Sequence, residues 1–437
     1  MNIIGLENAG TLRKVKLNKQ VNSHSSCEIE MILTDDNVND LEKYIGFEIV
    51  VEDDGIRLMI GKISSITLKQ SFSVSTIVFW ADSFSTEADK TPFNRVFQDT
   101  QKKYSDIVSC IKNVSLPVQI LEKGFAEEQE EHIIIQHNET DFEFVRRLSL
   151  SRGLNLFVDD TSQMCSLNIG RCFSGKKETI SDKDIILSEY FLDRFEVRYI
   201  ITSRKYFNFG SEVSLNGFDY LVIDFSLIYE NGTKIYKYIL SRSRSVEDMK
   251  TEPGNHSFIL GKGKVVSNDD PEHLGRIQVT FLEYEDKLMD NKLWIPYINN
   301  MTEKDRGMMF IPDADETVNL YVCNSVCYAS GCVRNKSYNS RMNDVSVRTL
   351  FTRNAEIDIS NKRIGIDAFD YKIEIYDGNA VIKKGGMEIS MNDDTISTKN
   401  SRSVISVGNA NIKIGSNETD ISGSSKVTIK TSVLDIG

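Results

Sequence analysis

Long apolar runs and a secretory leader are missing from this sequence. No stretch of about 18 or more apolar residues occurs, so a membrane-spanning helix is not expected. The first residues, MNIIGLENAG, have Glu7 within the apolar segment and no cationic start, which argues against a signal peptide. Only 6 of the 437 residues are proline and 26 are glycine, so collagen-like and low-complexity chains are also excluded. We expect a folded protein that is made in the cytoplasm.

Cysteine and histidine are too few and too scattered to indicate a catalytic centre. The seven cysteines are an odd number spread along the chain, which favours free thiols over a disulfide framework. Cys323, Cys327 and Cys332 come nearest to a metal site, but their spacing differs from that of zinc ribbons and no histidine follows them. The five histidines accompany no nucleophile motif, and no phosphate-binding glycine loop occurs. We therefore expect no enzyme activity, no cofactor and no metal, with the cysteine trio as the open question.

The sequence has fewer basic residues than acidic residues. Lys and Arg number 52 against 64 Asp and Glu, which gives a net charge of −12. A nucleic acid would have to bind against this overall field, so we expect no nucleic-acid partner. The length is enough for about three domains with sizeable cores.

The first half of the sequence, residues 1–250, is expected to be mainly β. Apolar and polar residues alternate in short stretches through the first 90 residues and again over 154–242, which predicts antiparallel strands. Two segments have helical periodicity instead. Apolar residues recur at helical spacing over 95–112, and Thr140 and Glu143 form a capping box ahead of a helix over 140–152. These two helices are expected to pack on the strands.

A compact group of strands follows the polar segment EDMKTEPGNHS. Residues 258–335 hold five short strand-like stretches. Five short strands in so few residues suit a small Greek-key barrel of the OB type.

The remaining residues, 346–437, carry a repeat of apolar pairs. Each pair is separated by one polar residue, and toward the end of the chain the pairs begin seven or eight residues apart. The apolar edge of one unit is two side chains wide, and nothing in this region covers it. Seven or eight residues are too few for one chain to encircle a core, whereas three chains that contribute one side each close the circuit. The repeat therefore predicts a homotrimer whose tails form an intertwined triple-stranded β-helix. The predicted axial residues are Ile405, Val407, Ile412, Ile414, Val427, Ile429, Leu434 and Ile436.

At this point the sequence resembles the VgrG proteins, the spikes of type VI secretion systems. The segment QHNETDFEFVRRL and the following glycine are similar to the signature of the VgrG hub, and a second segment, GKVVSNDDPEHLGRIQVTF, is similar to the OB barrel of VgrG and of phage tail spikes. The hub residues that fall on the pattern are Gln136, Glu139, Asp141, Phe142, Phe144, Arg147, Leu148 and Gly153. The barrel residues are Gly263 through Phe281, with Trp294, Gly307, Pro312 and Glu316. Together with the repeat, the resemblance covers most of the chain in the expected order.

The resemblance implies an architecture and a set of partners. The hub would contain two β-barrel-like domains per chain, the OB fold would form a neck, and the β-helix would form the spike. An Hcp-like tube protein would dock on the hub, and a PAAR-like tip protein would dock at Leu434, Ile436 and Gly437. Baseplate proteins, effector cargo and, transiently, a target membrane complete the implied partners.

Some relatives carry a lysozyme domain between barrel and spike, but here only about a dozen residues, 336–346, join the two. Asp269 and Asp270 precede a proline, which indicates a turn rather than a catalytic pair. Glu139, Asp141 and Glu143 lie at a helix start, where capping explains them. A peptidoglycan hydrolase and a β-rich adhesin are therefore the weaker alternatives.

The function expected from these observations is a structural hub and membrane-puncturing spike that is assembled in the cytoplasm and secreted by injection. The alternative is the equivalent hub and spike of a phage tail or of an extracellular phage-tail-like particle, which has the same architecture.

Overall fold

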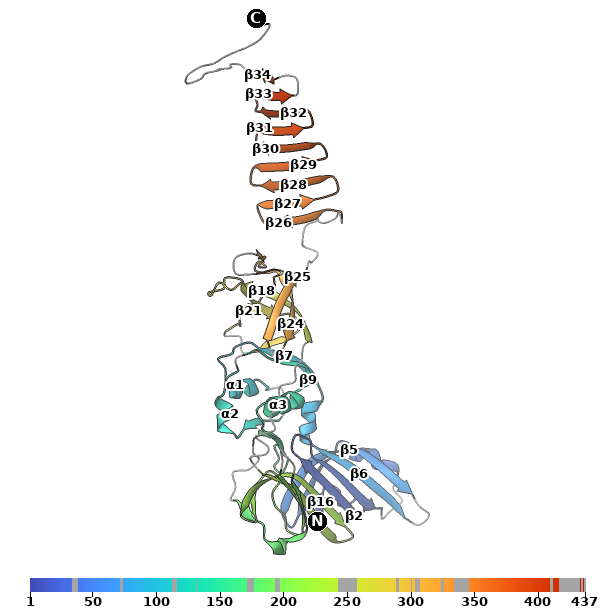
Figure 1. Ribbon diagram of the computed structural model, residues 1–437. Helices are drawn as coiled ribbons and strands as arrows, with labels where there is room; N and C mark the ends of the chain where they lie inside the picture. The colour runs from blue at the N-terminus through green and yellow to red at the C-terminus, as the bar shows by residue number, and fades with distance from the viewer. Residues whose placement is uncertain are drawn as a thin grey trace. The chain divides into compact units, whose positions relative to one another are not determined.

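The computed structural model describes most of the chain as two compact units, Met1–Val333 and Arg334–Gly437 (Figure 1). The described residues are 1–33, 38–70, 74–111, 116–130, 132–170, 177–192, 197–242, 258–287, 291–299, 301–302, 307–323, 326–333, 346–408, 412–415, 433 and 435. The fold is mainly β, as the alternating pattern predicts. Among these residues, no helix has the length and apolarity that crossing a membrane requires.

A sheet of twelve strands dominates the N-terminal part of the first unit. Ten of its strands follow the order β1-β4-β5-β6-β3-β2-β16-β17-β14-β13, while β15 pairs with β16, and β12 with β15. The strands before residue 100 are β1 (Asn2–Ile4), β2 (Thr11–Gln20), β3 (Ser26–Ile32), β4 (Glu48–Asp53), β5 (Ile56–Gln70) and β6 (Ser75–Ser83). The later strands are β12 (Glu178–Thr179), β13 (Ile185–Leu192), β14 (Val197–Ser203), β15 (Glu212–Leu215), β16 (Phe218–Glu230) and β17 (Thr233–Arg242). Short 3-10 helices lie at Val38–Tyr44, Phe84–Asp89 and Asp182–Asp184.

The two groups of strands that the resemblance assigns to separate barrel-like domains are joined in the structure. β2 pairs with β16 in antiparallel register, with Leu17 opposite Leu227. One hydrophobic core runs under both groups, from Ile29 and Phe79 in the first to Phe225 and Leu240 in the second. The described strands of the two groups therefore form one continuous sheet over a shared core. The pairing of β2 with β16, which joins the groups, is as regular as the pairing within each group.

A second core lies where the helices gather, between the sheet and the OB domain. Helix α3 and helix α1 pack with the strands around Phe144 and Leu167. The elements are α1 (Tyr104–Ser109), α2 (Lys123–Glu127), α3 (Asp141–Leu150), β7 (Pro92–Phe97), β8 (Val118–Ile120), β9 (Ile134–Thr140), β10 (Leu156–Asp159) and β11 (Ser166–Ile169).

The prediction of a helix over 95–112 is wrong in its first half. Residues Pro92–Phe97 form strand β7, which pairs with β9, and helix α1 covers only Tyr104–Ser109. The adjacent apolar residues Val96 and Phe97 also fit a buried strand. Their segment becomes a strand because it pairs with β9, which lies about forty residues further along the chain.

Helix α3 begins where the sequence places it. The Thr140 side chain accepts a hydrogen bond from the Glu143 backbone at 3.1 Å, and the Glu143 carboxylate accepts from the Thr140 backbone at 2.9 Å. This reciprocal pair satisfies two backbone donors that the helix cannot satisfy itself. Gly153 follows the helix with φ +70°, a conformation that glycine adopts without strain.

The OB domain has a five-stranded sheet in the order β21-β19-β18-β24-β25. Its core contains Val265, Val279, Ile295 and Leu320. The strands of this region are β18 (Phe258–Ser267), β19 (Arg276–Phe281), β20 (Glu285–Lys287), β21 (Ile295–Pro296), β22 (Met301–Thr302), β23 (Gly307–Met308), β24 (Thr317–Cys323) and β25 (Val326–Cys332).

Strand β20 ties the OB domain to the helical region. It pairs in parallel with β7, and Val96 of β7 belongs to the core of the OB domain. The buried Gln98 side chain donates to the Val279 carbonyl at 3.3 Å and to the Asp286 carboxylate at 2.7 Å. Together with the shared apolar core, these contacts join the two regions in one interior.

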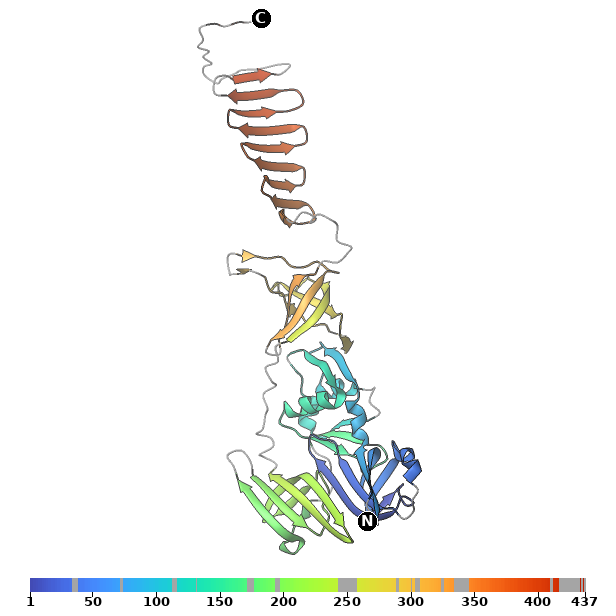
Figure 2. The same ribbon diagram turned by 90° about the vertical axis from the view of Figure 1, so that its right-hand side faces the viewer.

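The described strands of the C-terminal unit form one nine-stranded sheet in which each strand pairs antiparallel with the next (Figure 2). Figure 2 shows the strands following one another like the rungs of a ladder. They are β26 (Arg348–Phe351), β27 (Ala355–Ile359), β28 (Arg363–Ala368), β29 (Tyr371–Tyr376), β30 (Asn379–Lys384), β31 (Met387–Asn392), β32 (Thr395–Lys399), β33 (Val404–Gly408) and β34 (Ile412–Gly415).

Candidate functional site

Two columns of apolar side chains run along one face of the C-terminal sheet. Directly opposed residues on antiparallel strands point to the same side, so the strand register aligns the apolar pairs of successive strands. The first column is Ile359, Ile364, Ile375, Ala380, Met391, Ile396, Val407 and Ile412. The second is Leu350, Ile357, Ile366, Ile373, Ile382, Ile389, Thr398, Ile405 and Ile414. These residues are called the apolar face below.

Nothing in the described part of the chain covers the apolar face. Apart from the half-buried Ile373, its isoleucines are exposed, from 36% at Ile366 to 66% at Ile412. None of the described large apolar side chains of the C-terminal sheet is fully buried, whereas the first unit has three buried cores. A contiguous exposed apolar surface of this kind marks an interaction site, because water contact costs about 25 cal/mol per Å² of apolar area.

The opposite face of the sheet is polar and carries a chain of ion pairs. One charged residue from each of six consecutive strands takes part, and negative and positive residues alternate along the chain of pairs. The links are Asp358–Arg363 at 2.8 Å, Arg363–Glu374 at 3.0 Å, Glu374–Lys383 at 3.6 Å, Lys383–Glu388 at 3.9 Å and Glu388–Lys399 at 2.8 Å. The hydrogen bonds to Asp358 raise the pKa of the Arg363 guanidinium. The two faces therefore differ completely, and the polar one suits contact with water.

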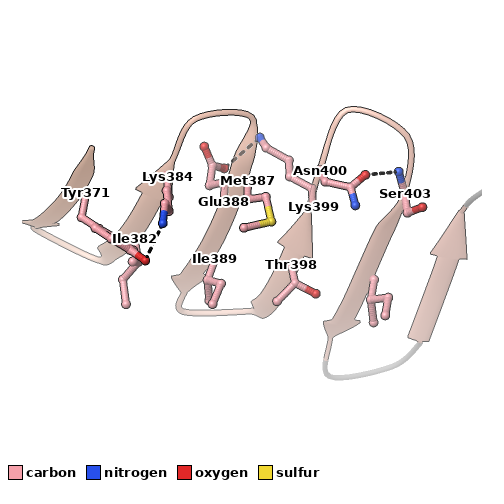
Figure 3. Close-up of a pocket in the computed structure, with 11 residues that line it drawn as sticks. Tyr371, Ile382, Lys384, Met387, Glu388, Ile389, Thr398, Lys399, Asn400 and Ser403 are labelled. Atoms are coloured by element: carbon pink, nitrogen blue, oxygen red, sulfur yellow. Dashed lines mark hydrogen bonds and ion pairs between the residues drawn. The ribbon is translucent and has the colours of Figure 1, made fainter. Parts of the chain in front are cut away.

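A hollow of about 370 Å³ opens at one margin of the apolar face (Figure 3). Its floor includes Ile382 and Ile389, and at its rim Lys384 donates to the Tyr371 hydroxyl at 2.9 Å. The other two charged groups that line it, Glu388 and Lys399, are bound to each other. These groups leave no unpaired acid or base in the hollow, so it is suited to packing against apolar groups rather than to proton transfer.

Half of the axial residues predicted from the sequence lie on the apolar face. Ile405 and Val407 belong to β33, and Ile412 and Ile414 to β34, directly opposite them. Their meeting on a threefold axis remains a prediction, because the structure contains one chain. The other predicted axial and tip residues lie outside the described residues; they are Val427, Ile429, Leu434, Ile436 and Gly437.

Sequence reasoning missed some members of the apolar face. Met391 and Ile396 stand opposite each other in the first column, and Ala380 fills the place before them. In the segment MEISM, both Met387 with Ile389 and Ile389 with Met391 are apolar pairs separated by one polar residue, and the register puts Ile389 and Met391 in the two columns. The alternation of apolar and polar residues in MEISM is visible in the sequence. The turns at the ends of the strand set the register, and the register decides which of the two apolar pairs aligns with the columns.

The acidic residues at the start of α3 do more than cap the helix. Glu143 caps it as expected, but Glu139 binds Arg147 at 2.6 and 2.7 Å. Asp141 is buried and forms an ion pair with the buried Arg95 of β7, and Gln136 hydrogen-bonds both. These carboxylates are held by cations, so they position α3 against β7 and β9.

Asp270 organises the turn before β19. Its carboxylate accepts from the backbone of Glu272, Leu274 and Arg276 and binds the Arg276 guanidinium at 2.7 Å. The hydrogen bonds from the Arg276 side chain hold the pKa of Asp270 well below its usual range, and the hydrogen bonds from the backbone amides lower it further. Asp269 donates its backbone amide to Ser267 at 3.3 Å and is part of the same turn.

The three late cysteines lie apart on one hairpin. Cys327 is buried opposite Val322, and burial raises the pKa of its thiol to about 12. Cys332 stands opposite Val318 at the other end of the hairpin, and its Sγ donates to Glu316 at 3.3 Å. Within the described residues, no group of three or more metal-ligating side chains is assembled.

Comparison with known proteins gives a domain match and a match of fold. Residues 261–325 match the family described as the type VI secretion system/phage-baseplate injector OB domain. A comparison of the sequence with curated proteins finds no relative. The structure is similar to the E. coli c3393 protein, described as a type VI secretion component with similarity to T4 tail proteins gp27 and gp5. The two are 11% identical, the match covers 76% of this chain and 99% of that one, and the TM-score is 0.56.

The chain is also similar to VgrG in complexes from Francisella. In the half-lidded PdpA-VgrG complex the identity is 11%, the coverage is 93% of this chain and 83% of that one, and the TM-score is 0.53. In the lidless complex the identity is 10%, the coverage is 93% of each chain, and the TM-score is 0.52. The resemblance to VgrG proteins is therefore confirmed: the chain contains an OB domain of the type VI secretion and phage-baseplate injector kind within a fold that is similar to VgrG.

Proposed function

We propose that the chain is the hub-and-spike subunit of a contractile injection system of the type VI secretion kind and that it works as a homotrimer. The observation that carries this proposal is the apolar face, which is exposed along the whole described length of a single-layer sheet. A sheet with one apolar face and one charged face needs a second layer to be stable in water. Other copies of the same sheet supply that layer without any further component.

Three copies suit this face better than two stacked sheets. Each copy contributes a strip two side chains wide, and three such strips enclose a narrow dry interior while the three charged faces stay in water. The resulting triple-stranded β-helix places Ile405, Val407, Ile412 and Ile414 on the axis. The same assignment extends to Val427, Ile429, Leu434 and Ile436, which lie outside the described residues.

The proposed parts have separate tasks. The hub, 1–250, docks an Hcp-like tube protein; the OB domain, 258–335, is the neck; and the spike, 346–437, carries a PAAR-like tip at Leu434, Ile436 and Gly437. Baseplate proteins hold the hub, and effectors travel with the assembly into a target cell. The task is mechanical rather than enzymatic, since interlocked chains resist unfolding under load.

The hub and spike of a phage tail, or of an extracellular phage-tail-like particle, is the alternative. The family that matches residues 261–325 covers both kinds of injector. In either case the protein assembles inside the producing cell and leaves it by injection.

The mass of the purified full-length protein tests the proposal. Light scattering is expected to give three times 49.6 kDa. Ile412→Asp and Ile414→Asp each place three like charges in the dry interior and are expected to break the spike apart. Lys413→Glu is the matched control, because Lys413 lies between them on the opposite face, and it should leave the trimer intact. A monomeric wild-type protein, or an intact spike in either aspartate variant, contradicts the proposal.

A further inference from the structure

The turns of the C-terminal sheet lie alternately on its two sides, because each strand pairs antiparallel with the next (Figure 2). The turns beside the first column of the apolar face are called the first margin; those described are 360–362, 377–378 and 393–394. The turns beside the second column are called the second margin; they are 352–354, 369–370, 385–386 and 400–403. Neighbouring strands are about 4.8 Å apart, so each first-margin turn lies midway in height between two second-margin turns.

The charges in these turns have opposite signs on the two margins. From the turn after β27 onward, the first margin reads positive, negative, negative. From the turn after β28 onward, the second margin reads negative, positive, positive. In this order the residues are Lys362, Asp377 and the pair Asp393 and Asp394 on the first margin, and Asp370, Lys384 and Arg402 on the second.

This chain leaves these charges without opposite partners. All seven side chains belong to exposed residues, and none of them forms an ion pair within the described part of the chain, whereas the charged residues of the polar face pair with one another. The second margin also has open space beside it. A Cβ added at Gly385 or Gly386 would meet nothing within 4 Å, and the hollow in Figure 3 reaches from Met387, next to this turn, to Asn400 and Ser403 of the following one.

We propose that the first margin of one chain contacts the second margin of the next chain, with each first-margin turn opposite the second-margin turn that follows it in the sequence. The inference rests on the proposed function, which supplies three copies around one axis. A contact between two different margins is head-to-tail, so it is repeated from copy to copy and closes after three. The pairs formed between copies are Lys362 with Asp370, Asp377 with Lys384, and both Asp393 and Asp394 with Arg402.

The opposite stagger is the competing arrangement. Twist tilts the strands of a sheet, and the direction of the tilt decides whether a first-margin turn meets the following or the preceding second-margin turn. With the preceding turn, Lys362 would face Arg353 and Asp377 would face Asp370, and both contacts join like charges. A twofold contact between two first margins would likewise gather aspartates together. Exposed pairs add little stability, but like-charge contacts exclude wrong arrangements, so the charge pattern selects the stagger.

Carbodiimide coupling of the full-length protein tests the contact, because this reagent joins a lysine amine to a carboxylate that touches it. The expected amide links are Lys384 to Asp377 and Lys362 to Asp370, in chains that run as covalent dimers and trimers under denaturing conditions. The members of each pair lie beyond opposite ends of one strand, β30 or β28, and are therefore roughly 20 Å or more apart within a chain. Each such link therefore joins two copies.

Lys384→Arg is the matched control. It keeps the positive charge, but a guanidinium is not coupled to carboxylates by this reagent. The variant should lose the link to Asp377 and keep the link between Lys362 and Asp370.

The outcomes separate this inference from the proposed function. A trimeric mass without these links, or with Lys384 joined to Asp393 or Asp394 of another copy in place of Asp377, overturns the stagger and leaves the trimer standing. A monomeric mass overturns the proposed function and the contact between the margins with it.

Discussion

Ile382 lies directly opposite Ile389 on the apolar face, and the two side chains are 43% and 50% exposed. Two isoleucines in register normally seal a sheet against a second layer. Here they line the hollow in Figure 3, and no described segment of the chain covers them.

The first prediction compares neighbouring residues on opposite faces of strand β30. Ile382→Ala should destabilise the assembled spike by about 2–5 kcal/mol per chain, because it removes methyl groups from a buried interior. Val381→Ala, on the charged face, should change stability by about 0.5 kcal/mol or less. Thermal unfolding of both variants measures the difference. Equal effects would show that the face bearing Ile382 stays in water.

The second prediction concerns the ion pairs of the polar face. Glu388 links Lys383 at 3.9 Å and Lys399 at 2.8 Å, and both lysines are about half exposed. Because solvent screens such pairs, Glu388→Gln should cost less than about 1 kcal/mol. The cost should fade when the unfolding is repeated in 1 M salt, where the Debye length is about 3 Å. A large, salt-independent loss would instead indicate that a partner chain buries this face.

The third prediction is a pH dependence at Asp270. Its folded-state pKa lies below the ordinary value of 3.8, so its ion pair and hydrogen bonds stabilise the OB domain fully at neutral pH. That contribution decreases as the pH falls below about 4, because the unfolded state then binds the proton more readily. The stability difference between wild type and Asp270→Asn should therefore be largest near pH 7 and should narrow in acid. A constant difference between pH 7 and pH 3 would contradict the assignment.

The fourth prediction concerns the buried ion pair between Arg95 and Asp141. The two side chains are 1% and 3% exposed. Asp141→Ala should cost about 3–5 kcal/mol, because it leaves the buried guanidinium with the more distant and half-exposed Glu285, at 3.7 Å, as its counter-charge. The double variant Arg95→Met with Asp141→Leu should be more stable than Asp141→Ala alone. Denaturant unfolding of the three proteins gives the comparison, and a double variant that is less stable than the single one would refute this account.

Local chemistry explains which features the sequence could predict. The capping box of Thr140 and Glu143 involves residues three apart, so it was visible in the sequence and the structure has it. Helix α1 was misjudged because residues 92–97 become a strand through pairing with β9, a distant segment. The partner of Asp141 could not be predicted for the same reason, since Arg95 lies forty-six residues earlier in the chain.

The apolar face shows the same division between local and distant information. By itself, the sequence determined that the tail has strands of alternating apolar and polar residues and that its apolar strip is narrow, because side-chain alternation is a property of each strand. The tertiary structure alone decided which isoleucines align into columns, and it joined β2 to β16 in one sheet. The reason is that strand register and sheet order depend on hydrogen bonds between segments far apart in the chain, and no single segment encodes them.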